Sequence, residues 1–201
     1  MAAPVLDFWF DFASTYSYMT AVRIGPLAEA ARVQVRFRPF LLGPIFKAQG
    51  WDTSPFNLYE AKGRHMWRDM ERLAADRALP FRRPSAFPQN SVLPARVALS
   101  GMIHGWGEEF SVATYRAEFE QGLRIDDATT LGAILTTLGI DAKTALDEAQ
   151  SEANKALLRA QTEQAHRIGI FGAPSFVTAN GELFWGNDRL EQALAWAARV
   201  P

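Results

Sequence analysis

The sequence of 201 residues contains no cysteine. That absence excludes a disulfide framework, a thiolate metal site and a cysteine nucleophile. The sequence also has no excess of charge of either sign, because 21 Lys and Arg stand against 22 Asp and Glu and the net charge is −1. Nucleic acid and anionic membrane surfaces are therefore not expected as partners.

Long apolar runs and targeting signals are also missing. No stretch of about eighteen apolar residues occurs, so we expect no membrane-spanning helix. The opening stretch MAAPVLDFWF has no basic start and no long apolar segment, so no signal peptide is predicted. These absences favour a soluble cytoplasmic protein.

Common catalytic signatures are absent as well. The sequence has no dinucleotide-binding or phosphate-binding glycine loop and no Gly-x-Ser-x-Gly elbow. His65, His104 and His166 lie far apart and lack the spacing of metal ligands, so no metal site is predicted.

What is present is strand character at the two ends of the chain and helical character between them. Apolar residues 5–10 predict a buried strand and residues 33–39 a half-buried one, with a helix over 17–32 between them. At the other end, Asn180-Gly181 predicts a hairpin of strands 175–178 and 182–185, followed by a helix over 188–199.

The middle of the chain is predicted to be helical after a loop over 41–52. Helical spacing of apolar residues predicts helices over 57–79, 91–104, 108–121, 127–138, 141–149 and 151–168. Asp126, Asp141 and Ser151 are candidate N-caps, and Gly139 and Gly169 are candidate helix ends. We therefore predict one domain from 1–40 and 166–201 and a helical insertion from 41–165.

DFASTYSY, residues 11–18, places hydroxyl groups where the first strand passes into a helix. The free N–H groups at such a junction stabilise an anion, and Ser14, Thr15 and Ser17 add hydroxyl donors. The alternative is that one of these residues is only an N-cap, worth about 1 kcal/mol. Ser14 has no histidine nearby in the sequence, so a donor role for its hydroxyl is more plausible than a nucleophilic one.

GAPSFV, residues 172–177, places a proline directly before a strand. A cis Ala173-Pro174 bond would explain this unusual start, and an ordinary trans proline that begins an edge strand is the alternative.

Taken together, these stretches resemble a known family. The chain is similar to the thioredoxin-fold group that contains 2-hydroxychromene-2-carboxylate isomerase and the kappa-class glutathione transferases, which are relatives of the DsbA-like oxidoreductases. The matching segments cover nearly the whole chain in the family's order: DFASTYSY, RPFLLG (38–43), KGRHMWRD (62–69), FPQNS (87–91), FGAPSF (171–176) and FWGNDRL (184–190). The resemblance implies a thioredoxin-like α/β fold with a large all-helical insertion.

The resemblance also implies glutathione as the cofactor. Ser14 occupies the place of the first cysteine of the redox motif and would hydrogen-bond the glutathione sulfur, so the thiol missing from this chain would come from the ligand. Ala173, before a cis-Pro174, would pair its backbone with the cysteinyl part. The segment formed by Trp185, Gly186, Asn187 and Asp188 would receive the γ-glutamyl end.

Three further positions match substrate contacts of the family's isomerases. Lys47, Asn57 and Asn90 would orient an aromatic carboxylate, and Lys62 and Trp67 on the next helix are candidates to face the same cleft. A solvated Lys47 and a core Trp67 are the alternatives.

The resemblance implies a homodimeric, glutathione-dependent isomerase that converts 2-hydroxychromene-2-carboxylate to trans-o-hydroxybenzylidenepyruvate, or acts on a similar intermediate of aromatic catabolism. A kappa-like transferase that conjugates electrophiles and a non-catalytic glutathione-binding protein are the alternatives. Two departures bear on the choice: Thr15 stands where many members have proline, and the loop over 49–56 differs from theirs.

Overall fold

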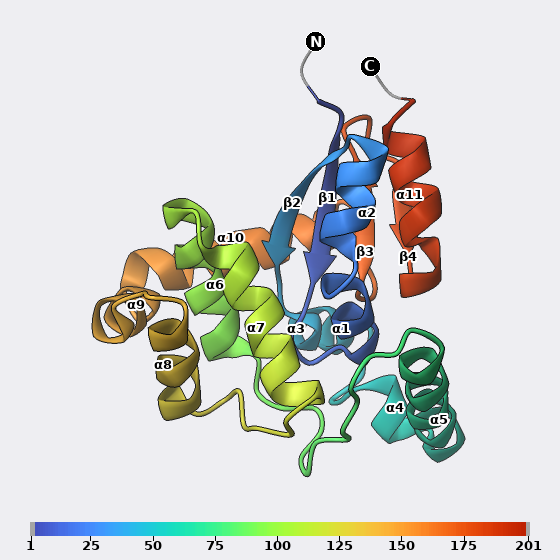
Figure 1. The fold of residues 1–201 in the computed structure, drawn as a ribbon. Helices are drawn as coiled ribbons and strands as arrows, with labels where there is room; N and C mark the ends of the chain where they lie inside the picture. Colours follow the sequence, from blue (N-terminus) through green and yellow to red (C-terminus); the bar gives the residue numbers. More distant parts are fainter. Residues whose placement is uncertain (1–2, 200–201) are drawn as a thin grey trace.

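The computed structural model describes residues 3–199, and its centre is a mixed sheet of four strands (Figure 1). The strands lie in the order β2-β1-β3-β4. β1 pairs in parallel with β2 and antiparallel with β3, and β3 pairs antiparallel with β4. Their bounds are β1 Val5–Phe10, β2 Gln34–Pro39, β3 Ser175–Thr178 and β4 Leu183–Trp185. The strands predicted at both ends of the chain therefore form one sheet.

The central strand β1 is buried on both faces because its alternating side chains enter two different cores. Leu6, Phe8 and Phe10 point into the larger core, and Trp9 packs in a second core on the opposite face. Asp7 shares the face of Trp9 by alternation, and it forms ion pairs with two arginines of β2. The apolar run that marked this strand in the sequence reflects these two cores.

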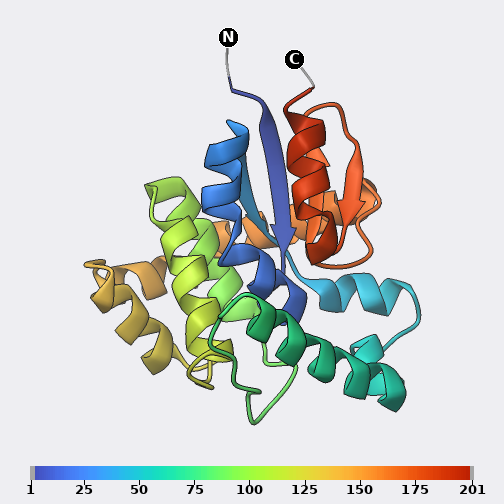
Figure 2. The ribbon, with the colours of Figure 1, turned by 45° about the vertical axis from the view of Figure 1, so that its right-hand side comes forward.

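Helices cover both faces of the sheet, as the turned view in Figure 2 also shows. α2 and α11 lie together on one face and contact the strands. α3 and α10 lie on the other face and contribute Ile45 and Ala165 to the second core. The bounds of the helices next to the sheet are α1 Thr15–Ala21, α2 Ile24–Ala31, α3 Leu42–Ala48, α10 Glu152–Arg167, η1 Asn187–Arg189 and α11 Leu190–Ala197.

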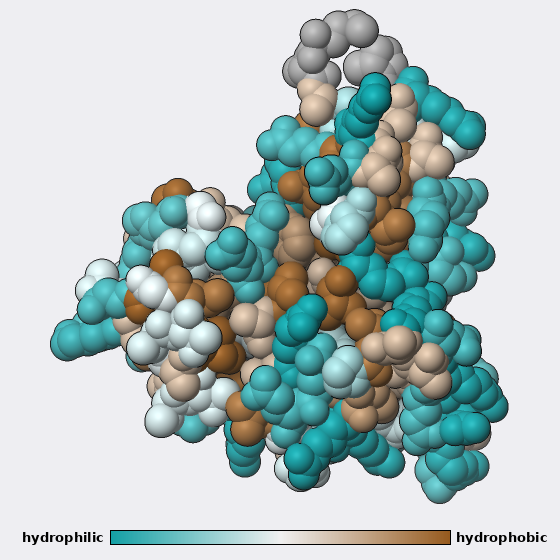
Figure 3. Space-filling view, in the orientation of Figure 1, coloured by the Kyte–Doolittle hydropathy of each residue, from teal (hydrophilic) through white to brown (hydrophobic). Residues whose placement is uncertain are grey.

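The segment between β2 and β3 consists of helices joined by loops, with no strand in residues 40–174, and confirms the predicted α/β fold with a helical insertion. α4 and α5 form one group, and α6 to α9 form another that packs through α7 against α1. Their bounds are α4 Pro55–Leu58, α5 Glu60–Asp76, α6 Val92–His104, α7 Gly107–Phe119, α8 Ala128–Thr137 and α9 Ala142–Ala149. Figure 3 shows hydrophobic residues gathered near the middle of the visible face, where the helices meet the strand-bearing part.

The prediction of one helix over 17–32 is wrong. α1 ends at Ala21, and α2 begins at Ile24. Pro26 is the cause, because in a continuous helix its ring would clash with the carbonyl of Val22 and one hydrogen bond would be missing. In the structure Pro26 falls in the first turn of α2, where its missing N–H costs nothing.

The prediction of a loop over 41–52 is also wrong, because most of this segment is α3. Its first turn accommodates Pro44, and the N–H of Leu42 donates to the carboxylate of Asp11 at 2.6 Å. This helix start therefore takes its cap from a residue 31 positions away, which local sequence does not indicate.

The predicted helix over 57–79 is divided into α4 and α5 by Tyr59, whose backbone is extended. α4 folds back so closely that a side-chain carbon at Gly63 would collide with the carbonyl oxygen of Phe56. Glycine at position 63 therefore permits the close approach of the two helices.

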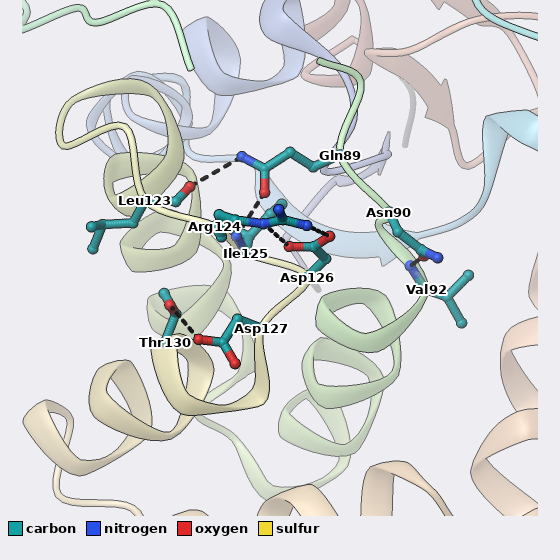
Figure 4. A network of polar contacts seen from close by, with 9 residues as sticks. All are labelled: Gln89, Asn90, Val92, Leu123, Arg124, Ile125, Asp126, Asp127 and Thr130. Atoms are coloured by element: carbon teal, nitrogen blue, oxygen red, sulfur yellow. Dashed lines mark hydrogen bonds and ion pairs between the residues drawn. The ribbon is translucent and has the colours of Figure 1, made fainter. Parts of the chain in front are cut away.

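Asp141 and Ser151 cap α9 and α10 as predicted. Asp126, however, is not the cap of α8: Asp127 accepts the N–H of Thr129 at 3.0 Å. Figure 4 shows the reason, because the carboxylate of Asp126 is bound by both ends of the Arg124 guanidinium at 2.9 and 2.6 Å. Gly139 and Gly169 follow their helices with positive φ, which confirms them as helix ends.

Within the range 3–199, every helix is too short or too polar to cross a membrane.

Candidate functional site

Ser14 stands at the junction of β1 and α1 and is almost completely buried. Its Oγ accepts the N–H of Ser17 at 3.2 Å, which makes it the N-cap of α1. The same hydroxyl donates its proton to the carbonyl oxygen of Ala173 at 3.0 Å. Ser14 therefore caps α1 and makes a second hydrogen bond at the same time. Its role as an N-cap thus does not exclude a role as a hydrogen-bond donor.

Ala173 reaches Ser14 through the pairing of β3 with β1. The register places Ser175 opposite Trp9, so the two residues before Ser175 lie beside the end of β1. The Ala173-Pro174 bond is cis, which is one of the two alternatives that GAPSFV left open and the one that the family resemblance implies. The carbonyl of Pro174 accepts the N–H of Gly186 at 3.0 Å, which ties this turn to the segment after β4.

The segment Trp185–Asp188 is shaped by Gly186, whose φ of +111° is favourable for glycine alone. A side-chain carbon there would also lie only 2.5 Å from Oδ1 of Asp188. Asn187 is buried and accepts the hydroxyl proton of Thr20 at 3.3 Å. The side chain of Asp188 is 72% exposed and pairs with Arg189 at 3.3 Å, so its carboxylate is available to a ligand.

These segments line one cleft of about 1390 Å³. It brings together all seven residues predicted to hold glutathione: Ser14, Ala173, Pro174, Trp185, Gly186, Asn187 and Asp188. Residues separated by more than 150 positions in the sequence thus share one surface.

Part of the wall of the cleft is aromatic. Phe46 and Trp51 lie with ring centroids 5.8 Å apart, and Phe56 lies 6.4 Å from the ring of Tyr16. Phe87 completes this wall, and the bond that follows it, to Pro88, is a second cis peptide. None of these aromatic residues was predicted individually, although Trp51 and Phe56 lie in the loop over 49–56 that the family resemblance places at the cleft.

The predicted substrate residues divide into two groups. Asn90 and Lys62 line the cleft, and Asn90 uses its side-chain oxygen to accept the N–H of Val92 at 3.0 Å (Figure 4). The amide nitrogen of Asn90 therefore remains as a donor. Lys47 and Asn57 are exposed and lie outside the lining of the cleft.

Trp67 is part of the packing between α5 and the segment after it, and it does not line the cleft. Its ring makes an edge-on contact with Phe87 at 4.8 Å and lies under the guanidinium of Arg83 at 4.6 Å. The core alternative for Trp67 is the one that the structure supports.

Asp11 also lines the cleft and was not predicted as a site residue, although it is the first residue of DFASTYSY. Its side chain is buried, and it accepts N–H groups from Ala13 at 2.9 Å and Leu42 at 2.6 Å. Burial raises the pKa of this carboxyl above its usual value, and the hydrogen bonds from Leu42, Ser91 and Ala13 oppose the rise. The signal available in the sequence was a carboxylate directly after an apolar strand.

Two further titratable groups lie behind Asp11 on α7. The hydroxyl of Tyr115 donates to the main-chain oxygen of Asp11 at 2.8 Å. Glu118 is fully buried, and both of its carboxyl oxygens lack a hydrogen-bond partner within the described residues. Burial, reinforced by Asp11 and Asp126, raises the pKa of Glu118 well above its usual value, so this carboxyl favours its neutral form.

The fold and the junction of Ser14 with a cis-proline turn define a thioredoxin-fold protein. Residues 5–195 match the model of the DSBA-like thioredoxin domain family, and the chain belongs to that family.

Individual similar proteins indicate which members of this family the chain resembles. A 2-hydroxychromene-2-carboxylate isomerase from Sphingobium xenophagum is 30% identical over 187 residues, which cover 92% of this chain and 94% of that protein. A glutathione S-transferase kappa 2 from Caenorhabditis elegans is 23% identical over 207 residues, covering 96% and 92% of the two chains. The solved structure of a 2-hydroxychromene-2-carboxylate isomerase matches with a TM-score of 0.86 at 24% identity and covers 98% of this chain and 95% of that one. The resemblance inferred from sequence motifs is thereby confirmed.

Proposed function

We propose that this protein is a glutathione-dependent isomerase that converts 2-hydroxychromene-2-carboxylate to trans-o-hydroxybenzylidenepyruvate, or acts on a related intermediate of aromatic catabolism. The observation that carries the proposal is the position of the Ser14 hydroxyl, at a helix start, beside a cis-proline turn and in the lining of a large cleft. Relatives with the isomerase name support the reaction class.

The residues around Ser14 suit glutathione in their chemistry. Asp188 offers an exposed carboxylate for the ammonium of the γ-glutamyl end, and the start of η1 and α11 offers N–H groups for its carboxylate. Ala173 and cis-Pro174 present a backbone edge beside Ser14 on which an extended peptide can pair. When bound, glutathione supplies a thiolate that adds reversibly to the substrate and so permits rotation about a double bond.

The role of Ser14 is to stabilise negative charge on sulfur. In the structure its proton is directed at the carbonyl of Ala173, and rotation of one hydroxyl redirects it to an anion in the cleft. A hydrogen bond to an ionised acceptor is roughly twice as strong as one between neutral groups, so the redirected contact is favoured. The free N–H groups of the first turn of α1 act in the same direction.

The substrate would occupy the space between Ser14 and the aromatic wall. Phe46, Trp51 and Phe56 offer ring faces and edges to a flat aromatic compound. The amide nitrogen of Asn90 is a donor for an oxygen of the substrate. Because Lys47 and Asn57 lie outside the lining, the proposal keeps Asn90 alone of the three residues taken from the family.

The test is to mix the protein with glutathione and 2-hydroxychromene-2-carboxylate and to analyse both products. Rotation of the substrate with full recovery of free glutathione supports the isomerase. A stable glutathione adduct would contradict the isomerase and support a kappa-like transferase. Binding of glutathione without turnover would contradict both enzymes and support a glutathione-binding protein. A cytoplasmic location would give the cleft access to the reduced glutathione pool, and light scattering tests the homodimer that belongs to the same proposal.

A further inference from the structure

Asp11 lies at the base of the cleft, directly beside the turn that carries Ser14. Its main-chain oxygen accepts the N–H of Ser14 at 2.9 Å, and its side chain accepts the N–H of Ala13 at 2.9 Å. Asp11, Ala13 and Ser14 all line the cleft. The carboxyl is therefore fixed close to the place where the proposed function puts a sulfur atom.

The side chain of Asp11 still has room for a proton. A carboxylate offers about four lone-pair sites, and the N–H groups of Ala13 and Leu42 and the hydroxyl of Ser91 use three of them. None of the Lys, Arg or His side chains described between residues 3 and 199 forms an ion pair with it. The carboxylate at the base of the cleft is thus stabilised by neutral donors, namely backbone N–H groups and the Ser91 hydroxyl, and not by a cation.

The groups that face Asp11 from the neighbouring elements do not add a positive charge either. Tyr115 and Glu118 come from α7, Ser91 precedes α6, and Leu42 begins α3. The pKa of Tyr115 and the pKa of Glu118 are both raised well above their usual values by burial, so both groups favour their neutral forms. Asp11 is therefore the carboxyl of this cluster that lies beside the Ser14 turn and lines the cleft.

From this arrangement we infer that the Asp11 carboxylate accepts the thiol proton of glutathione, while Ser14 donates a hydrogen bond to the sulfur. This inference rests on the proposed function. The S–H bond breaks and its electron pair stays on sulfur, and an O–H bond forms on the carboxyl of Asp11, so no other reactant is needed. The total charge at the base of the cleft stays at −1, whereas loss of the proton to water would leave two adjacent negative charges in a buried place.

Two measurements on the whole protein test this assignment. Ultraviolet absorbance gives the amount of thiolate formed when glutathione binds at neutral pH. Calorimetric titration in two buffers of different ionisation enthalpy gives the number of protons released to solution. If Asp11 takes the proton, the wild-type protein releases clearly fewer protons than the thiolate it forms. One proton released per thiolate formed in the wild type overturns the assignment without need of any variant.

The Asp11→Asn variant is the second test, because it removes the carboxylate that would accept the thiol proton but keeps the size of the side chain. The ratio of protons released to thiolate formed is expected to rise to about one in this variant. Asp52→Asn is the matched control, since Asp52 lines the same cleft but is exposed, and its ratio should equal that of the wild type. An unchanged ratio in Asp11→Asn overturns the role of Asp11.

The outcomes also separate this inference from the proposed function. Absence of glutathione binding, or binding without thiolate, overturns both. Thiolate formation with one proton released per thiolate overturns the role of Asp11 and leaves the role of Ser14 in place.

Discussion

The hydroxyl of Ser14 donates to the carbonyl of Ala173 at 3.0 Å across 159 residues of sequence. This bond joins the start of α1 to the cis-proline turn, which are the two segments that the proposed function requires to act together. It also gives the Ser14 proton a partner until an anion arrives, so the buried hydroxyl has an acceptor without a ligand.

Replacement of Ser14 by alanine should reduce turnover by roughly 10²–10³, the loss seen when one donor to a developing anion is removed. The variant should fold, with a stability loss of about 1 kcal/mol from the missing N-cap. Steady-state kinetics with glutathione and the chromene substrate measures the first effect, and thermal unfolding measures the second.

Thr15→Val is the control for Ser14→Ala. Thr15 lies next in the chain and is also buried, but its hydroxyl lacks a partner within the described residues. An isosteric apolar side chain should therefore leave turnover and stability nearly unchanged. If Thr15→Val lost as much turnover as Ser14→Ala, the special role of the Ser14 hydroxyl would be wrong.

Gly186→Ala should weaken glutathione binding by about tenfold, which corresponds to about 1.4 kcal/mol. The new carbon would collide with Oδ1 of Asp188 and would sit at a φ of +111°, so the Asp188 carboxylate has to move. Calorimetric titration with glutathione measures the change in affinity.

Gly139→Ala is the control for Gly186→Ala, because it introduces backbone strain at a positive φ far from the Asp188 carboxylate. Gly139 has a φ of +75° at the end of α8 and no atom close enough to collide with a new carbon. It should lower stability by about 1 kcal/mol through backbone strain and leave glutathione affinity unchanged. Equal loss of affinity in both variants would contradict the contact between Gly186 and Asp188 as the cause.

Asn90→Asp tests the substrate side of the cleft. The aspartate keeps the oxygen that accepts the N–H of Val92 but loses the amide donor and adds a charge that repels a carboxylate. We expect a rise in the KM of the aromatic substrate by roughly 10–100-fold, the value of a hydrogen bond to a charged group. The KM of glutathione should stay the same.

Lys47→Ala and Asn57→Ala are the comparison for Asn90→Asp. Both side chains lie outside the cleft lining, so we expect little change in the KM of the substrate. A large rise in either variant would show that these residues reach the substrate, as the family resemblance implies, and would overturn the preference for Asn90.

The local sequence was sufficient to predict those strands, turns and helix caps that depend only on their own residues. The apolar run of β1, the Asn180-Gly181 hairpin and the caps Asp141 and Ser151 are examples, and the structure confirms all of them. Pro26 also carried the needed information, since a proline nine residues into a predicted helix should have divided it.

Other features depend on contacts between distant residues, which periodicity does not reveal. α3 begins where Asp11 caps it, and α4 turns back where Gly63 admits the carbonyl of Phe56. The pairing of Ser14 with Ala173 could be expected only from the family resemblance, because no local pattern links the two segments. The individual residues of the aromatic wall and the second cis bond, at Pro88, were not predicted.

Glu118→Gln should stabilise the protein increasingly as pH rises. Glu118 is buried without a hydrogen-bond partner, and burial raises its pKa well above the usual value. In the unfolded chain the carboxyl ionises above its ordinary pKa, whereas in the folded protein it keeps its proton, so the wild type loses stability with rising pH until the folded pKa is reached. Glutamine stays neutral in both states and has no such loss.

The difference in free energy of unfolding between Glu118→Gln and the wild type should therefore be small in acid and grow by up to about 1.4 kcal/mol per pH unit above the ordinary pKa of glutamate. Urea unfolding at a series of pH values measures it. Glu29→Gln is the control, because Glu29 is exposed on α2 and its replacement should give a nearly constant difference. A constant difference for Glu118→Gln as well would mean that Glu118 is ionised in the folded protein, which would require a cation or solvent near a side chain that the structure shows buried without a partner.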